Sequence, residues 1–223
     1  SKAFTSLLIH ALSEEGLVDL DATAQSYLPW LHLGEPDGPV TLRQLLSHTS
    51  GLIMGADHLP DELAQVWSLR DRARVTTGDF HYSNVGYMVL GQVVEAVTGH
   101  TVAAALHGGL LRRMGMADAR VGVTHADRAV MATGHWPLHD DRPWYAGDPI
   151  AHATWFEIAC ADGNIASSAR ELAHLGTLLL NGGVVGAQEH SGHPWRWHGG
   201  LLDFLYHRPH GWCGHRGTDQ RQW

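Results

Sequence analysis

The 223-residue chain is long enough for one large domain or two small ones, and its 44% hydrophobic and 17% charged residues are typical of a globular protein. Its formal net charge of −8 argues against a nucleic-acid-binding surface, which would need clustered lysine and arginine. No uninterrupted apolar run approaches the roughly 20 residues that a membrane-spanning helix requires, so we expect no transmembrane segment in this chain.

The first predicted helix covers residues 2–15. Its apolar side chains share one helical face, and Gly16 can end the helix as the residue after its C-cap; the face is formed by Phe4, Leu7, Leu8, Ala11 and Leu12. Lys2 is the only lysine among the 15 basic residues of the chain. A lone lysine at the start of an apolar helix is therefore a candidate for a specific role.

Two shorter segments follow. Thr41 and Gln44 have the spacing of a capping box, which predicts a helix over 42–48. A more polar amphipathic stretch runs over 61–74. Because few segments alternate apolar and polar residues, most of the structure visible in the sequence is helical.

The strongest helical periodicity follows Ser83 and ends at Gly99. Another helix is expected over 101–115, and the region 121–158 is expected to be rich in loops. Ser168 and Glu171 have capping-box spacing, which predicts a last helix ending in the Asn-Gly-Gly of 181–183.

The composition changes near residue 190. Four of the nine tryptophans and six of the 18 histidines lie in 190–223, with little aliphatic periodicity. We therefore divide the chain into a main domain over 1–189 and a tail over 190–223. The tail is a separate structural element, a disordered segment or a product of a shifted reading frame.

Five passages, in this order, resemble the serine β-lactamase and penicillin-binding-protein family, closest to class C β-lactamases, D-alanyl-D-alanine carboxypeptidases and related esterases. They are SKAFTSLLIHALSEEGLVDLD at 1–21, TLRQLLSHTSGL at 41–52, FHYSNVGYMVLGQVVEAVTGHTV at 80–102, MGMADARVG at 114–122 and ADGNIASSARELAHLGTLLLNGG at 161–183. The resemblance implies an α+β fold of the β-lactamase/transpeptidase type, represented here mainly by its helical part.

The family uses Ser-X-X-Lys chemistry, in which serine and lysine lie one helical turn apart and the serine attacks an acyl carbon. By resemblance, Lys2 is the motif lysine, and Tyr82-Ser83-Asn84 is the family's Tyr-X-Asn motif. Tyr82 is then the proton-transfer partner, and Asn84 hydrogen-bonds the substrate amide or Lys2. A free lysine amine has an ordinary pKa near 10.4 and is almost fully protonated at neutral pH, so burial and a proton acceptor are needed for it to act as a base.

The motif serine should stand three residues before Lys2, and only Ser1 precedes it. Adjacent helical residues point about 100° apart, so Ser1 cannot replace that serine. We therefore expect the chain to be truncated at its N-terminus and to be inactive by itself in nucleophilic catalysis.

The family's third motif, Lys- or His-X-Gly on a strand that borders the site, has two candidates. His215-Arg216-Gly217 fits by residue type and is preferred, with His215 as a substrate-binding residue. Trp197-His198-Gly199 is the alternative, because some family esterases carry tryptophan there.

Simpler interpretations exist for these residues. Lys2 could be a solvated lysine near a terminus, and Tyr82 could be a turn tyrosine with Ser83 capping the next helix. His48, in the HTSG passage, is expected to be structural, closing a turn. No histidine pair has the HExxH spacing and no Cys/His cluster is present, so no metal site is predicted.

These observations predict a serine acyl hydrolase that works through an acyl-enzyme on a small lactam, peptide or ester substrate, with no cofactor and no nucleic acid. The alternative is a non-catalytic relative that binds peptidoglycan-like or peptide ligands as a sensor or scaffold.

Overall fold

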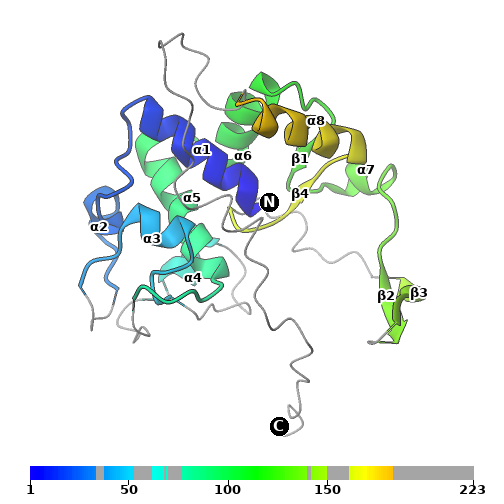
Figure 1. The fold of residues 1–223 in the computed structure, drawn as a ribbon, viewed down its shortest axis with the longest axis horizontal. Helices are drawn as coiled ribbons and strands as arrows, with labels where there is room; N and C mark the ends of the chain where they lie inside the picture. The colour runs from blue at the N-terminus through cyan, green and yellow to red at the C-terminus, as the bar shows by residue number, and fades with distance from the viewer. Residues whose placement is uncertain are drawn as a thin grey trace, which may run out of the picture.

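The computed structural model describes residues 1–33, 38–52, 62–67, 69, 77–139, 142–149 and 161–182 (Figure 1). Helices dominate this part of the chain, and its strands form two small antiparallel sheets. The tail predicted over 190–223 lies outside the described residues.

Helix α1 spans Lys2–Glu14, close to the predicted range. Its predicted apolar face is buried except at Ala11, which is partly exposed, and Leu7 is fully inaccessible to solvent. Gly16 has a φ of 73°, which is the left-handed conformation expected after a helix end. Truncation of a buried leucine such as Leu7 to alanine typically costs about 2–5 kcal/mol, so α1 is anchored by its packing rather than by its caps.

Helix α5 (Asn84–Thr98) is the central helix, and residues of α1, α2, α3 and α4 contact it. The Ser83 hydroxyl accepts the N–H of Gly86 at 3.0 Å, and Gly99 ends the helix with a φ of 68°. Apolar side chains cover most of its circumference, as expected for a helix that other elements surround. They include Val85, Val89, Leu90, Val93 and Val94, all at most 1% exposed.

Three short helices, α2 (Ala24–Tyr27), α3 (Leu42–Leu46) and α4 (Glu62–Trp67), contact α5. The capping box of Thr41 and Gln44 is present, with both reciprocal hydrogen bonds. Helix α3 ends two residues earlier than predicted, because His48 has a φ of 60°, which an α-helix cannot include.

The predicted helix over 101–115 has an unexpected interior. It begins as α6 (Val102–Ala104), capped by Thr101, and continues as the π-helix η1 (Ala105–Leu111). Leu106, Leu110 and Leu111 face the core, whereas Gly108 and Gly109 have open space beside them. Two adjacent glycines weaken the preference for regular α-helix, and the π-helical turns keep the leucines buried.

The remaining elements lie on the side of the molecule where α1 begins (Figure 1). Helix α8 (Ala169–Leu180) follows β4 (Ile165–Ala166), which pairs antiparallel with β1 (Arg120–Val121). The Ser168 hydroxyl accepts the N–H of Glu171, but the predicted capping box is incomplete. Its glutamate instead accepts hydrogen bonds from the Asp118 N–H and the Ser167 hydroxyl, at 2.7 and 2.8 Å.

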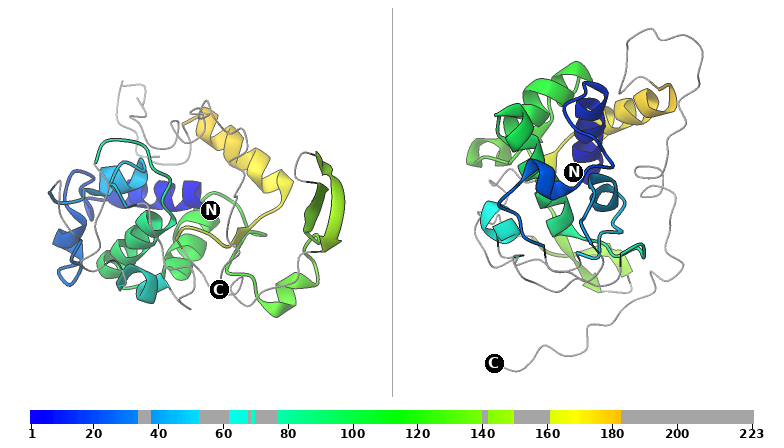
Figure 2. Two further views of the ribbon diagram at one scale, coloured as in Figure 1. Left: turned by 90° about the horizontal axis from the view of Figure 1, so that it is seen from below. Right: turned by 90° about the vertical axis from the view of Figure 1, so that its left-hand side faces the viewer.

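The prediction of loops over 121–158 was only partly right. Helix α7 (His125–Arg128) begins with a capping box formed by Thr124 and Asp127. Strands β2 (His135–His139) and β3 (Arg142–Pro149) then form a hairpin with irregular register. Figures 1 and 2 show this hairpin at one end of the molecule, away from α1 and α5. Prolines at 137, 143 and 149 interrupt the alternation of apolar and polar residues that would have revealed the strands in the sequence.

Candidate active site

Lys2 lies at the first position of α1 and is only 6% exposed. Its Nζ donates to the Asn84 Oδ1 and to the backbone carbonyl of Asp162, both at 2.8 Å. These two acceptors are 82 and 160 positions away in the chain. The only lysine of the 223-residue chain is therefore held by two residues from distant segments.

Asn84 begins α5, so the first residues of α1 and α5 meet side chain to side chain. The capping hydroxyl of Ser83 fixes this helix start. The N-terminal end of a helix carries a partial positive charge. Two such ends and an ammonium group together give a local field that favours an anion or a developing oxyanion.

Tyr82 lies beside the same amine. The centroid of its ring is 4.9 Å from the Lys2 Nζ, and the side chain is 53% exposed. A second ring, that of Tyr87, has its centroid 5.6 Å from the same nitrogen. Tyr82 thus combines contact with the buried amine and access to solvent, which a residue that meets both Lys2 and a substrate requires.

His48 supports the Tyr82–Asn84 segment. Its Nδ1 accepts the N–H of Ser83 at 3.1 Å, and its carbonyl accepts the N–H of His81 at 2.8 Å. Its ring stacks on that of Tyr82, with centroids 4.8 Å apart. Burial, followed by the charge of Lys2, lowers the pKa of His48 to about 4, so the imidazole is neutral at physiological pH. The structural role expected for His48 is observed.

Nothing in the local sequence connects the HTSG passage with Tyr82. The connection depends on a hydrogen bond between residues 35 positions apart. The 48–51 passage, which follows α3, contains two left-handed residues, His48 and Gly51, with φ of 60° and 74°. A histidine with positive φ is uncommon, and such a conformation persists only where surrounding contacts hold the residue in place.

The segment Asp162-Gly163-Asn164 contributes the backbone carbonyl that Lys2 contacts. Just before it, the Ala161 carbonyl accepts the Thr5 hydroxyl at 2.6 Å, and Asn164 has a φ of 65°. The role of this segment is played by its main chain, so residue types alone could not have assigned it. His215 and the alternative Trp197-His198-Gly199 lie outside the described residues.

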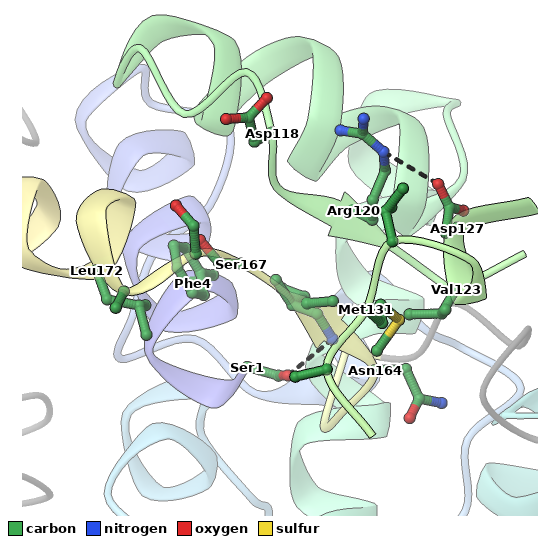
Figure 3. Close-up of a pocket in the computed structure, with 16 residues that line it drawn as sticks. Ser1, Phe4, Asp118, Arg120, Val123, Asp127, Met131, Asn164, Ser167 and Leu172 are labelled. Atoms are coloured by element: carbon green, nitrogen blue, oxygen red, sulfur yellow. Dashed lines mark hydrogen bonds and ion pairs between the residues drawn. The ribbon is translucent and has the colours of Figure 1, made fainter. Parts of the chain in front are cut away.

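An open cavity of about 900 Å³ borders the start of α1 (Figure 3). Ser1 lies on its edge, with its hydroxyl accepting the N–H of Ile165 at 3.0 Å. Apolar side chains from α1, β4 and α8 line one wall, including Phe4 and Leu172, and the ion pair of Arg120 and Asp127 lies opposite. Lys2, Tyr82 and Asn84 are not among its lining residues. The cavity is thus lined by the α1 neighbours of Lys2, Ser1 and Phe4, and not by Lys2 itself.

No single helix in the described part of the chain is long and apolar enough to cross a bilayer. Helix α5 together with 102–111 has sufficient length and apolar content, but the two segments meet at a bend of 80°.

A lysine at a helix start, hydrogen-bonded to the asparagine of a Tyr-Ser-Asn segment, is the arrangement that the resemblance to the Ser-X-X-Lys family implies. The chain belongs to the β-lactamase family, whose sequence model matches residues 1–223. Members of this family are serine hydrolases, and the fold is of the β-lactamase/transpeptidase type, as the resemblance implied.

Individual relatives agree with this assignment. Penicillin-binding protein 4* of Bacillus subtilis (strain 168) is 29% identical over 141 residues, which are 54% of this chain and 29% of that protein. Among solved structures, a class C β-lactamase from Rhodobacter sphaeroides is 26% identical with a TM-score of 0.65, covering 83% of this chain and 51% of the other. The octameric penicillin-binding protein homologue from Pyrococcus abyssi is 25% identical with a TM-score of 0.67, covering 89% and 49%. The chain thus spans about half of these structures.

Proposed function

We propose that the protein to which this chain belongs is a serine acyl hydrolase that forms an acyl-enzyme with a small lactam, peptide or ester substrate. The observation that carries the proposal is the pair of hydrogen bonds from the Lys2 amine to Asn84 and to the Asp162 carbonyl. A solvated surface lysine keeps its amine in water and has no need of two fixed acceptors. Burial of Lys2 together with these acceptors is typical of an amine with a specific task.

The proposed roles follow from the donors available. An ammonium group has three N–H donors, and Asn84 and Asp162 engage two of them. The third position on the nitrogen is the one we assign to proton exchange with the serine hydroxyl and the Tyr82 phenol: it carries an N–H in the ammonium form and a lone pair in the neutral amine that accepts the proton. The serine would stand three positions before Lys2, a position that the 223 residues do not include, so the chain alone is proposed to be inactive.

In this mechanism the serine oxygen attacks the acyl carbon, and its proton passes to the amine or the phenolate. The leaving group takes a proton from the same pair, and water then releases the acyl group by the reverse route. His215 remains the proposed substrate-binding residue of the third motif. No cofactor or metal is proposed for this chemistry.

The test compares three proteins: the chain as it stands, the chain extended by Ser-Ala before Ser1, and the chain extended by Ala-Ala. Each is incubated with a fluorescent penicillin and with a p-nitrophenyl ester. We expect covalent labelling or a burst of nitrophenol only from the Ser-Ala extension, and loss of it in Lys2→Ala. Labelling of the unextended chain that disappears with Lys2→Ala would show that a different nucleophile operates.

The non-catalytic alternative makes a different prediction in the same experiment. A binding module would retain a penicillin or a peptidoglycan-like peptide reversibly, and the extension with serine would change nothing. Mass spectrometry of the denatured protein separates the two, because only an acyl-enzyme survives denaturation.

A further inference from the structure

Glu62, at the start of α4, is a buried acidic residue that the proposed chemistry does not use. It is only 7% exposed, and its Oε2 accepts the N–H of Ala161, 99 positions away, at 2.9 Å. Helix α5 leaves room for it: a Cβ at Gly91 would collide with the Glu62 Oε1 and with the Ala161 methyl group. The carboxyl group therefore occupies a space that depends on a glycine in the central helix.

The peptide segment that Glu62 holds is the one that contacts the amine. Ala161 immediately precedes Asp162, whose carbonyl accepts from Lys2 at 2.8 Å. From the other side, the Thr5 hydroxyl of α1 donates to the Ala161 carbonyl at 2.6 Å. Consequently α1 and α4 fix the same two residues, one through a donor and the other through an acceptor.

This arrangement is costly for the fold. Burial, together with the nearby charges of Asp162 and Glu95, raises the pKa of Glu62 to about 8, although hydrogen bonds from Ala161 and Gln92 oppose the rise. An apolar side chain of similar volume would avoid the cost of burying an acid. It could not, however, accept the Ala161 N–H, and that is the property which distinguishes glutamate here.

We propose that Glu62 is a positioning residue for the site: it holds the Ala161–Asp162 segment where the Asp162 carbonyl meets the amine of Lys2. The meaning of this role for catalysis rests on the proposed function. Its geometric content does not, since it concerns where one carbonyl lies relative to one amine.

The test uses the full chain grown with ¹³C-labelled lysine, which gives a single side-chain signal because Lys2 is the only lysine. The Lys2 Cε resonance and the hydrogen-exchange rate of the Ala161 amide are measured in Glu62→Leu, Glu62→Asp and Glu62→Gln. Leucine removes the acceptor, aspartate withdraws it by one methylene, and glutamine keeps a carbonyl oxygen at the same reach. The urea-unfolded chain supplies the signal of a free lysine.

We expect Glu62→Leu and Glu62→Asp to speed Ala161 exchange at least tenfold and to move the Lys2 signal toward that of the free lysine. Glu62→Gln should keep the Ala161 exchange rate within about twofold of the wild type and should leave the Lys2 signal in its wild-type position. If Glu62→Leu does not fold, the comparison of Glu62→Asp with the wild type tests the proposal. An unmoved Lys2 signal in Glu62→Asp, or an equal movement in Glu62→Gln, would overturn the proposal.

Glu171 offers a matched control, because it is also a buried glutamate that accepts a distant backbone N–H, that of Asp118. Glu171→Leu should leave the Lys2 signal in place; movement as large as in Glu62→Leu would mean general loosening and would overturn the proposal. These measurements require no turnover. A failure of penicillin labelling with an intact Glu62 effect therefore counts against the proposed function alone, and the converse result counts against the positioning role alone.

Discussion

The Nζ of Lys2 lies 2.8 Å from the Oδ1 of Asn84, so the first residue of α1 and the first residue of α5 are joined by a hydrogen bond. This bond connects the two helices at the ends where their partial positive charges lie. It therefore orients the amine relative to Tyr82, which precedes α5 by two positions. The bond can be tested directly by mutation of Asn84.

Replacement of Asn84 by alanine should destabilise the protein by about 1–3 kcal/mol, because a buried ammonium loses one of its acceptors. Urea denaturation measures the free energy of unfolding. Asn181→Ala, at the exposed C-cap of α8, serves as the control and should change it by no more than about 0.5 kcal/mol. Equal effects of the two substitutions would contradict a stabilising role for the Lys2–Asn84 hydrogen bond.

His48 should make the fold sensitive to acid. Its pKa is about 4 in the fold and 6.5 ordinarily, so between these values the unfolded chain binds a proton that the fold excludes. Stability is then lost as the pH falls from 6.5 to 4, by about 3 kcal/mol in all. His48→Asn, whose side chain tolerates the positive φ and does not titrate, should flatten this part of the stability curve.

The measurement for His48 is the free energy of unfolding between about pH 4 and 7, the range over which its charge changes. Tyr82→Phe keeps the ring that stacks on His48 and should keep the acid slope of the wild type. An acid slope that persists unchanged in His48→Asn would assign it to other groups.

Glu62 has the opposite dependence. Its pKa is raised from 4.5 to about 8, so the fold retains a proton that the unfolded chain has lost, and stability decreases as the pH rises through this window. Glu62→Gln should remove the decrease, and its advantage over the wild type should grow by about 1.4 kcal/mol for each pKa unit separating the two states, up to about 5 kcal/mol. Thermal unfolding followed from pH 4.5 to 8 tests this, and parallel curves would contradict it.

Gly99 should be sensitive to substitution at the end of α5. Its φ of 68° is strained for any side chain, although no atom would lie within 4 Å of an added Cβ, so Gly99→Ala should cost about 1 kcal/mol. Gly108→Ala, in the open part of η1, should instead be neutral or stabilise by up to about 1 kcal/mol, since it restricts the unfolded chain. Urea denaturation of both variants provides the comparison, and equal losses of stability would contradict the distinction.

The sequence predicted best what depends on local chemistry. The limits of α1 and α5, the cap at Ser83 and the left-handed Gly16 and Gly99 all follow from residue type and spacing, and all are observed. The π-helix was not predictable, because it reflects the need to keep Leu106 and Leu110 in a core whose shape other segments set.

For the site, motif resemblance was sufficient to select Lys2, Tyr82 and Asn84, and the structure brings the three together. Their catalytic roles stay predictions. The contributions of Glu62 and of the Asp162 carbonyl could not be inferred, since one is a long-range contact of a buried acid and the other belongs to the main chain. Neither feature leaves a local pattern in the sequence.

The wide chain separation of the acceptors of Lys2 has a consequence for biosynthesis. Asn84 and Asp162 follow the amine by 82 and 160 positions, so a nascent chain must have emerged beyond residue 162 before the amine can be enclosed. Enclosure of the amine thus depends on contacts of very high sequence separation, which form slowly, and the single lysine of the chain can report when they are in place.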